Sequence, residues 1–168
     1  GVFFTSCAGG MSCYYELPLK REKVEGTALK LSLSQFMSGH TGILIDSGRA
    51  NAVKWMDRIL LEAKAQGVNF RLVSIEGGEK HNAIPGDARA VIITKDVEKF
   101  KEIATNVHEY SAKELKTIEL KNPKLEITET ENVPALTEEC SSKVLDLLSA
   151  IYHGVWEMHP EIEGVVRT

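Results

Sequence analysis

The stretch TALKLSLS, residues 27–34, decides which fold class this chain is expected to adopt. Leucines occupy every second position and polar residues fill the positions between them: Leu29, Leu31 and Leu33 alternate with Lys30, Ser32 and Ser34. Successive side chains of a β-strand point to opposite faces, so this period of two predicts a strand with one buried face. Such half-buried strands are typical of antiparallel sheets.

Five further segments with a regular pattern follow this strand. In chain order they are a helix over 52–63, strands over 69–77 and 88–95, a helix over 97–107 and a strand over 124–130. The order strand, helix, strand, strand, helix, strand predicts an α+β fold, the ferredoxin-like split βαβ sandwich. One face of its four-stranded antiparallel sheet carries both helices, and we expect solvent or a partner on the other face.

The helix ends can be assigned from residues that favour caps. Asp46 or Ser47 is expected to cap the first helix, and Asp96 the second. A third, C-terminal helix is expected to begin at Thr137, with acidic residues in its first turn. The apolar stripe predicted for this third helix consists of Cys140, Val144, Leu147, Leu148 and Ile151.

The pattern divides the chain into three parts. Residues 27–131 form the predicted sandwich, residues 1–26 are a connecting segment, and residues 132–168 hold the third helix and a second connecting segment. The sequence does not begin with methionine, and both of its ends resemble short strands. We therefore expect a domain that is inserted into a longer protein.

Composition argues against several classes of partner. The 168 residues carry a net charge of −4 with acids and bases interspersed, which does not suit nucleic-acid binding. No apolar run approaches the roughly 20 residues that span a bilayer, so no membrane partner is expected. The three cysteines, Cys7, Cys13 and Cys140, lack a metal-binding spacing and are typical of reduced thiols in a cytoplasmic protein.

The sequence contains no complete catalytic apparatus. Its five histidines include no pair at the spacing of a zinc peptidase helix, and no Cys-x-x-Cys motif occurs. A nucleophile elbow and a phosphate-binding loop are also missing from the sequence. We predict that this chain supplies no metal ligands.

Two polar residues lie in restrained loops at strand ends. His40 stands between glycines in SGHTG, residues 38–42, where its imidazole can reach outward as a hydrogen-bond donor. A surface or structural histidine is the alternative. Asn82 lies in a loop that Pro85 restrains, and its amide can bind a carboxylate or a peptide group. An asparagine that caps its own turn is the alternative there.

Five motifs together carry a resemblance to a known family. In chain order they are CAGG at 7–10, SGHTG at 38–42, GRANA at 48–52, RLVSIEGG at 71–78 and NAIP at 82–85. With these motifs the chain resembles the aminoacyl-histidine dipeptidases, carnosinase-like enzymes of a co-catalytic zinc metallopeptidase clan. The resemblance covers essentially the whole chain, and CAGG with RLVSIEGG narrows it to the dipeptidase branch.

The resemblance implies the lid and dimerisation domain of a two-domain enzyme that cleaves Xaa-His dipeptides. Two zinc ions would be held by a catalytic domain outside residues 1–168, so this chain alone is expected to be inactive. His40 matches a lid histidine that stabilises the oxyanion as metal-bound water attacks, across the interface of a homodimer. Asn82 matches a position that holds the substrate's backbone or terminal carboxylate.

Two positions depart from the pattern of this family. Many members of the clan bind the substrate carboxylate with an arginine where this chain has Lys95, which cannot form a bidentate pair. Lys95 is nevertheless kept as a candidate substrate-binding residue. Some dipeptidases have an arginine at the place of Glu157, so a substrate contact from the C-terminal segment is not carried over.

Two alternative functions stay open at this point. A ferredoxin-like sandwich can be a non-enzymatic module that dimerises or senses a small molecule. Within the clan, an aminoacylase or a desuccinylase would carry the same kind of lid, and only substrate profiling would separate these enzymes from a dipeptidase.

Overall fold

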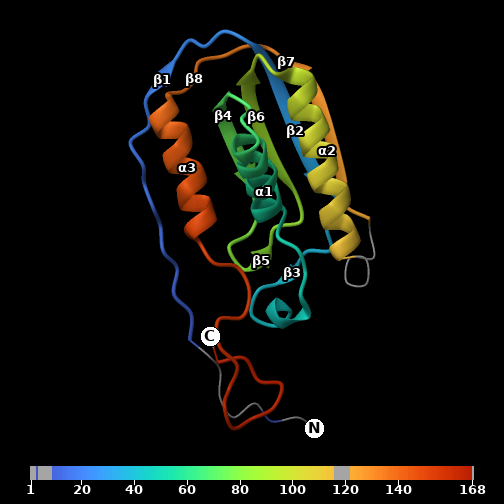
Figure 1. Cartoon of the computed structure of the whole chain (residues 1–168). Helices are drawn as coiled ribbons and strands as arrows, with labels where there is room; N and C mark the ends of the chain where they lie inside the picture. Colours follow the sequence, from blue (N-terminus) through green and yellow to red (C-terminus); the bar gives the residue numbers. More distant parts are fainter. Residues whose placement is uncertain (1–2, 4–8, 116–121, 168) are drawn as a thin grey trace.

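The computed structural model describes residues 3, 9–115 and 122–167, and it has the predicted α+β fold (Figure 1). Its main sheet is antiparallel, with four strands in the order β4-β6-β2-β7. The strand bounds are Thr27–Ser34 for β2, Phe70–Gly77 for β4, Ala88–Thr94 for β6 and Lys124–Thr130 for β7. The TALKLSLS strand is thus central, paired with β6 on one side and β7 on the other.

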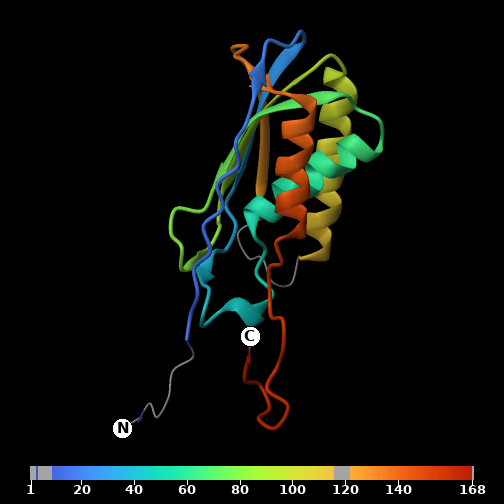
Figure 2. The ribbon, with the colours of Figure 1, turned by 90° about the vertical axis from the view of Figure 1, so that its left-hand side faces the viewer.

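Three helices cover one face of this sheet. They are α1, Ala52–Ala65, α2, Val97–Glu114, and α3, Glu138–Ala150. Figure 2 shows the sheet edge-on, with all three helices on the same side of it. The first two are the crossover helices of the predicted split βαβ sandwich, and α3 lies beside α1 over β4.

The leucine side of β2 forms the centre of the core. Leu29, Leu31 and Leu33 are buried, whereas Lys30 between them is exposed. The same core cluster includes residues of all three helices, among them Met56, Ile59, Leu60, Phe100, Ile103 and Leu145. The predicted alternation is confirmed from Leu29 to Leu33, where the leucines face the helices and Lys30 faces water.

A smaller apolar cluster lies at one end of the opposite face. Ala28, Val73 and Ile93 are buried there, and Val24 and Ala135 pack on them. The last two residues belong to the segments before β2 and after β7, so the chain itself covers this end of the face. These segments pair with each other through β1, Arg21–Glu22, and β8, Ala135–Leu136.

The predicted cap of the first helix is wrong. Asn51 caps α1, and its Oδ1 accepts a hydrogen bond from the backbone N–H of Val53 at 2.9 Å. Asp46 and Ser47 instead lie in a short 3₁₀ helix, η1, Ile45–Ser47, which Gly48 ends with a φ of 69°. The chain must turn once more before α1 can begin, and that turn separates the predicted caps from the helix.

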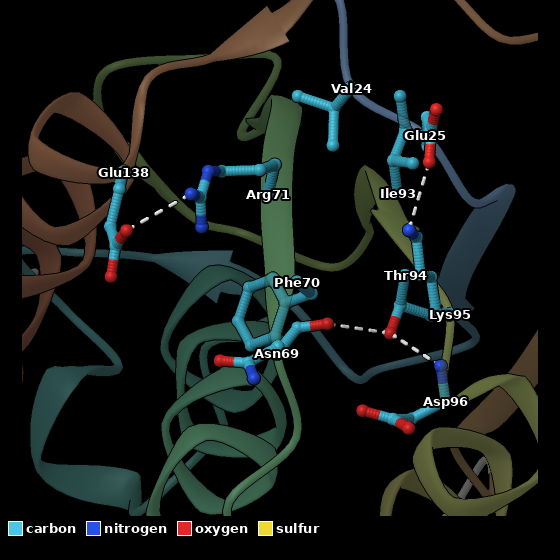
Figure 3. A pocket seen from close by; sticks show the side chains of 10 residues that line it. All are labelled: Val24, Glu25, Asn69, Phe70, Arg71, Ile93, Thr94, Lys95, Asp96 and Glu138. Carbon is cyan, nitrogen blue, oxygen red and sulfur yellow. Dashed lines mark hydrogen bonds and ion pairs between the residues drawn. The ribbon is translucent and has the colours of Figure 1, made fainter.

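The predicted starts of the other two helices agree with the structure to within one residue. Asp96 is the N-cap residue of α2, but its side chain makes no capping bond. The neighbouring Thr94 is buried, and its Oγ1 accepts from the Asp96 N–H at 3.1 Å and donates to Asn69 O at 2.7 Å (Figure 3). Thr137 caps α3 by accepting a hydrogen bond from the Cys140 N–H at 3.3 Å.

The predicted apolar stripe of α3 is wrong in part. Cys140 is buried as expected, but the other buried residues of this helix are Ser141 and Leu145, and Ile151 is 44% exposed. Burial of a serine is compatible with the core here because its hydroxyl has two backbone partners. Ser141 Oγ accepts from the Leu72 N–H at 3.1 Å and donates to Leu136 O at 3.4 Å.

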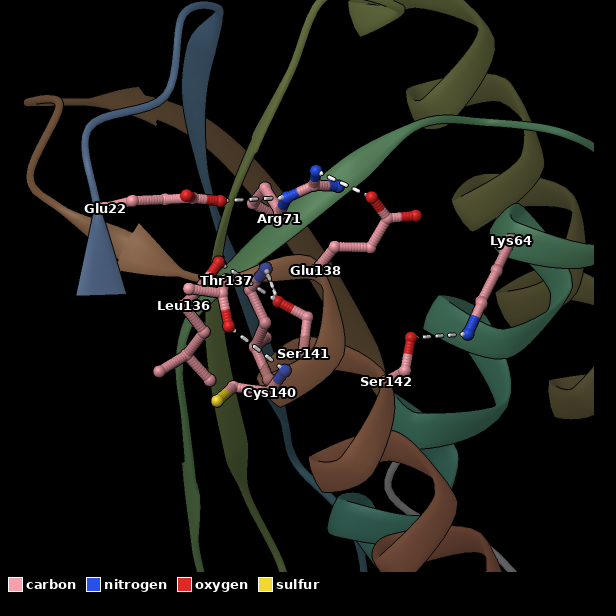
Figure 4. Close-up of polar contacts among 10 residues, drawn as sticks. Glu22, Lys64, Arg71, Leu136, Thr137, Glu138, Cys140, Ser141 and Ser142 are labelled. Atoms are coloured by element: carbon pink, nitrogen blue, oxygen red, sulfur yellow. Dashed lines mark hydrogen bonds and ion pairs between the residues drawn. The ribbon is translucent and has the colours of Figure 1, made fainter. Parts of the chain in front are cut away.

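Beside Ser141, side chains occupy the outer edge of β4 (Figure 4). Besides the bond from Leu72 to Ser141, the Arg21 guanidinium donates to Val73 O at 2.9 Å. The guanidinium of Arg71 in β4 also forms ion pairs with α3 and β1, since it lies 3.0 Å from the Glu138 carboxylate and 3.8 Å from the Glu22 carboxylate. The groups that another strand would need are therefore already bonded along this part of the edge.

Replacing Ser141 with alanine is expected to lower the free energy of unfolding by about 1–3 kcal/mol. The substitution leaves the buried N–H of Leu72 without its acceptor, and that loss has this typical cost. Ser142→Ala is the matched control: Ser142 bonds Lys64 at the surface, and such changes stay within about 0.5 kcal/mol. Urea unfolding of both variants checks the prediction, and equal effects would contradict it.

Asp57 of α1 is a buried carboxylate, only 3% exposed. Burial raises its pKa to about 6, Lys54 opposes the shift, and Asp146 of α3 adds to it. Among the described residues, one of its carboxylate oxygens has no hydrogen-bond partner. The unfolded chain has the lower pKa, so the folded protein binds the proton more tightly and loses stability as the pH rises from about 4 to about 6.

Asp57→Asn is expected to be more stable than the parent at pH 7.5 by about 1–3 kcal/mol, because it removes the buried charge. At pH 4 the Asp57 carboxyl is protonated, so the difference should shrink toward zero. Unfolding free energies from urea titrations at the two pH values measure this. Asp46→Asn, at an exposed position in η1 and not among the groups that shift the pKa of Asp57, serves as the control. A stabilisation that does not change with pH would count against a buried charge at Asp57.

Candidate functional site

Two loops at the same end of the sheet pair with each other as a short ribbon (Figure 1). β3, Gly39–His40, lies in the connection from β2 to α1, and β5, Ala83–Ile84, lies in the connection from β4 to β6. His40 is opposite Ala83, and the Thr41 N–H donates to Asn82 O at 3.0 Å. The ribbon therefore brings together two residues that the sequence suggested separately, His40 and Asn82.

The imidazole of His40 is exposed and has a defined orientation. Its Nδ1 accepts a hydrogen bond from the Gly42 N–H at 3.0 Å. Since Nδ1 uses its lone pair in this bond, the proton of the neutral ring is on Nε2. A donor in that position can stabilise negative charge that develops on a substrate oxygen.

The strand that carries His40 has an uncommon backbone. Ser38 has a φ of 47°, and its Oγ donates to Ile84 O at 2.7 Å across the ribbon. Gly39 has a φ of 154°, and a Cβ there would lie 2.7 Å from Arg49 Nη1 and 2.9 Å from Leu44 Cδ1. The positive φ favours glycine next to His40, and the ends of the Arg49 and Leu44 side chains fill the space beside it.

Asn82 presents its amide at the surface of the turn before β5. The Ala83 N–H closes this turn by donating to Lys80 O at 3.2 Å. Within the described ranges, no hydrogen bond involves the side chain of Asn82, so the turn does not depend on self-capping. The amide is available for a ligand next to His40.

Lys95 directly follows β6, at the end of the sheet opposite to the ribbon. The seven residues of β6 separate it from the ribbon, which is roughly 20 Å at the usual rise of a strand. Its Nζ pairs with Glu25 at 3.0 Å, and it lines a pocket of about 510 Å³ with Phe70, Arg71 and other residues. A single chain does not bring Lys95 to His40, so its role in substrate binding stays a prediction.

The remaining histidines have other surroundings. His108 bonds Pro123 O at 3.1 Å, and burial lowers its pKa. His159 accepts a hydrogen bond from the Glu161 N–H at 3.2 Å. His153 meets Asn51 Nδ2 at 3.3 Å, and His81 is an exposed turn residue.

Sequence reasoning missed the connection between the ribbon and the start of α1. Arg49 donates to Ser38 O, the Ala52 N–H donates to Pro85 O at 3.0 Å, and Asn51 contacts the C-terminal segment through His153. The available signal was the asparagine of GRANA directly before a helical pattern, which is a typical N-cap.

The described residues contain no group of three or more His, Cys, Asp or Glu side chains that could hold a metal ion. Cys13 and Cys140 are free thiols, and Cys7 lies outside the described residues. The residues that the structure describes therefore do not fit a zinc site. No helix among them is long and apolar enough to cross a membrane.

Comparison with known proteins gives a consistent result. The peptidase dimerisation domain matches residues 31–119, more than half of the chain. The cytosol non-specific dipeptidase of Escherichia coli is 33% identical over all of this chain and 35% of its own length. The crystal structure of aminoacylhistidine dipeptidase from Vibrio alginolyticus superposes with a TM-score of 0.83 at 28% identity, over 89% of this chain and 31% of that one. The chain thus spans about a third of each relative.

Proposed function

This chain belongs to the peptidase dimerisation domain family, and we propose that it is the lid and dimerisation part of a longer dipeptidase. The observation that carries the proposal is the ribbon on which an oriented, exposed imidazole stands next to an available amide. The similarity to two dipeptidases supports the same reaction class, peptide hydrolysis. The described residues lack a metal site, so this part alone is proposed to be inactive.

His40 is the proposed catalytic residue of this part. Its Nε2–H would donate to the carbonyl oxygen of the scissile peptide bond and hold it more strongly as negative charge develops there. The Gly42 N–H keeps the ring in the tautomer that can donate. The short ribbon can move as a unit with the lid, which would bring the donor to a substrate only when the site closes.

Asn82 and Lys95 are the proposed substrate-binding residues. The amide of Asn82 would bind the backbone or the terminal carboxylate of the substrate, on the same ribbon as the His40 donor. Lys95 can reach such a substrate only from another copy of the chain or after a large movement, because it lies at the far end of β6.

The proposed substrates are dipeptides, including Xaa-His dipeptides, and the proposed compartment is the cytosol. The names of the two relatives support this class, one as an aminoacylhistidine dipeptidase and the other as a non-specific cytosol enzyme. The two zinc ions implied by the sequence resemblance would need ligands from outside this chain. We therefore derive no catalytic step through them.

A homodimer is proposed to form through β7. The outer edge of β7 pairs with no strand among the described residues, whereas side chains occupy the β4 edge. An open edge can pair with the same edge of a second copy, which would join two sheets into one. His40 of one copy could then serve the active site of the other.

In the longer dipeptidase, His40→Ala is expected to lower kcat by about 100- to 1000-fold, the typical loss for one oxyanion donor. The free energy of unfolding should change by less than about 0.5 kcal/mol, because the side chain is exposed. Steady-state kinetics with an Xaa-His dipeptide, alongside urea unfolding, test this. His81→Ala, in the exposed turn near Asn82, is the matched control. Full turnover without the imidazole of His40 would remove it from the mechanism.

Two variants, each with one added lysine, test the proposed dimer. Thr128→Lys puts a lysine on the β7 edge, and Ser32→Lys puts one on the same face of the central strand β2. Edge lysines oppose strand pairing, so Thr128→Lys should raise the dimer Kd by about tenfold or more while Ser32→Lys leaves it nearly unchanged. Sedimentation velocity over a range of concentrations measures both. A parent chain that stays monomeric, or equal effects of the two lysines, would contradict pairing at β7.

A further inference from the structure

The side chain of Arg49 lies against the backbone of the strand that carries His40. Its Nη1 donates to Ser38 O. A Cβ built on Gly39 would be 2.7 Å from Nη1 and 3.3 Å from Cζ of the same guanidinium. The guanidinium therefore occupies the place that a side chain at position 39 would take.

Arg49 and the imidazole of His40 are on opposite faces of β3. Successive side chains of a strand alternate between its two faces, so a group on the Gly39 side lies behind the His40 side. Arg49 is thus placed to support the strand and not to touch a ligand held by the imidazole. Any effect on His40 must pass through the backbone of Ser38 and Gly39.

The bond from Arg49 supports a conformation that the backbone does not favour by itself. Ser38 has a φ of 47°, in the left-handed region that residues other than glycine rarely adopt. Its Oγ is bonded to Ile84 O, and its carbonyl oxygen is bonded to the guanidinium. A charged donor makes a stronger hydrogen bond than a neutral one, and Arg49 forms no ion pair with any described residue that would compete for it.

Arg49 directly precedes the start of α1 in the chain. It lies between Gly48, which ends η1, and Asn51, which caps the helix. One residue into the helix, the Ala52 N–H donates to Pro85 O at 3.0 Å. Residues 49–52 therefore bond next to both strands of the ribbon: Arg49 bonds Ser38 before β3, and Ala52 bonds Pro85 after β5.

We propose that Arg49 is a positioning residue for His40, which ties the ribbon to the N-terminus of α1 and sets the direction of the imidazole. This inference rests on the catalytic role proposed above for His40. Its structural part, the order of the ribbon, can be measured in this chain without any enzymatic assay.

The first test is amide hydrogen exchange by NMR in the 168-residue chain. The Thr41 N–H, which bonds Asn82 O, reports on the ribbon. Arg49→Ala should lower its protection by about tenfold or more, and Arg49→Lys, which keeps the charge but not the planar group, by about threefold. Arg58→Ala is the control, because Arg58 pairs with Glu114 on the outside of the helices and should leave Thr41 unchanged.

Unchanged protection of Thr41 in Arg49→Ala would overturn the proposal. If Arg49→Ala fails to fold, Arg49→Lys is the variant that tests the proposal. Protection of Thr41 in Arg49→Lys that equals its protection in the parent would then overturn it. The amides of β2 and β6 should keep their protection in every folded variant, and a loss spread over the whole sheet would point to general destabilisation and would also contradict a positioning role.

The second test uses the longer dipeptidase. Arg49→Ala should lower kcat by about tenfold or more with KM changed by less than about threefold, and Arg49→Lys should recover part of the loss. An increase of KM alone would indicate a substrate contact and overturn the proposal. A longer protein without peptidase activity would refute the proposed function, while the exchange experiment would still decide whether Arg49 orders the ribbon.

Discussion

The burial of one face of β2 under α1 and α2 is the constraint on which the rest of the structure depends. Leu29, Leu31 and Leu33 lose nearly all contact with water, and β2 pairs with a neighbour on each side. A shift of the register by one residue would bring Lys30 and two serines into the core, so pairing and burial fix each other. Because β2 is the central strand, the segment before it and the connection after it lie at opposite ends of the sheet.

The two ends of the sheet carry different structures. At one end, the connections after β2 and β4 meet in the ribbon that presents His40 and Asn82. At the other end, the segments before β2 and after β7 pair with each other and cover the apolar cluster around Val73. The exposed side chains of His40 and Asn82 thus lie at the opposite end of the sheet from the segments before β2 and after β7.

Much of the fold could be predicted because it depends on short-range patterns. The alternation in β2, the helical stripes of α1 and α2 and the positions of Asp96 and Thr137 are all properties of neighbouring residues. The predictions that were wrong concerned Asp46, Ser47 and part of α3. The cap of α1 differs because η1 is inserted before the helix, and Ser141 is buried because it bonds the distant edge of β4.

By itself, the sequence determined the fold class, the family resemblance and two of the loops in which functional residues could lie. The tertiary structure alone decided that His40 and Asn82 are adjacent, that Lys95 is not beside them, and that Arg49 lies behind the His40 strand. The physical reason is the distance along the sequence between the residues that interact. Periodicity and capping act between residues a few positions apart, whereas a ribbon between two loops exists only after the sheet has brought their ends together.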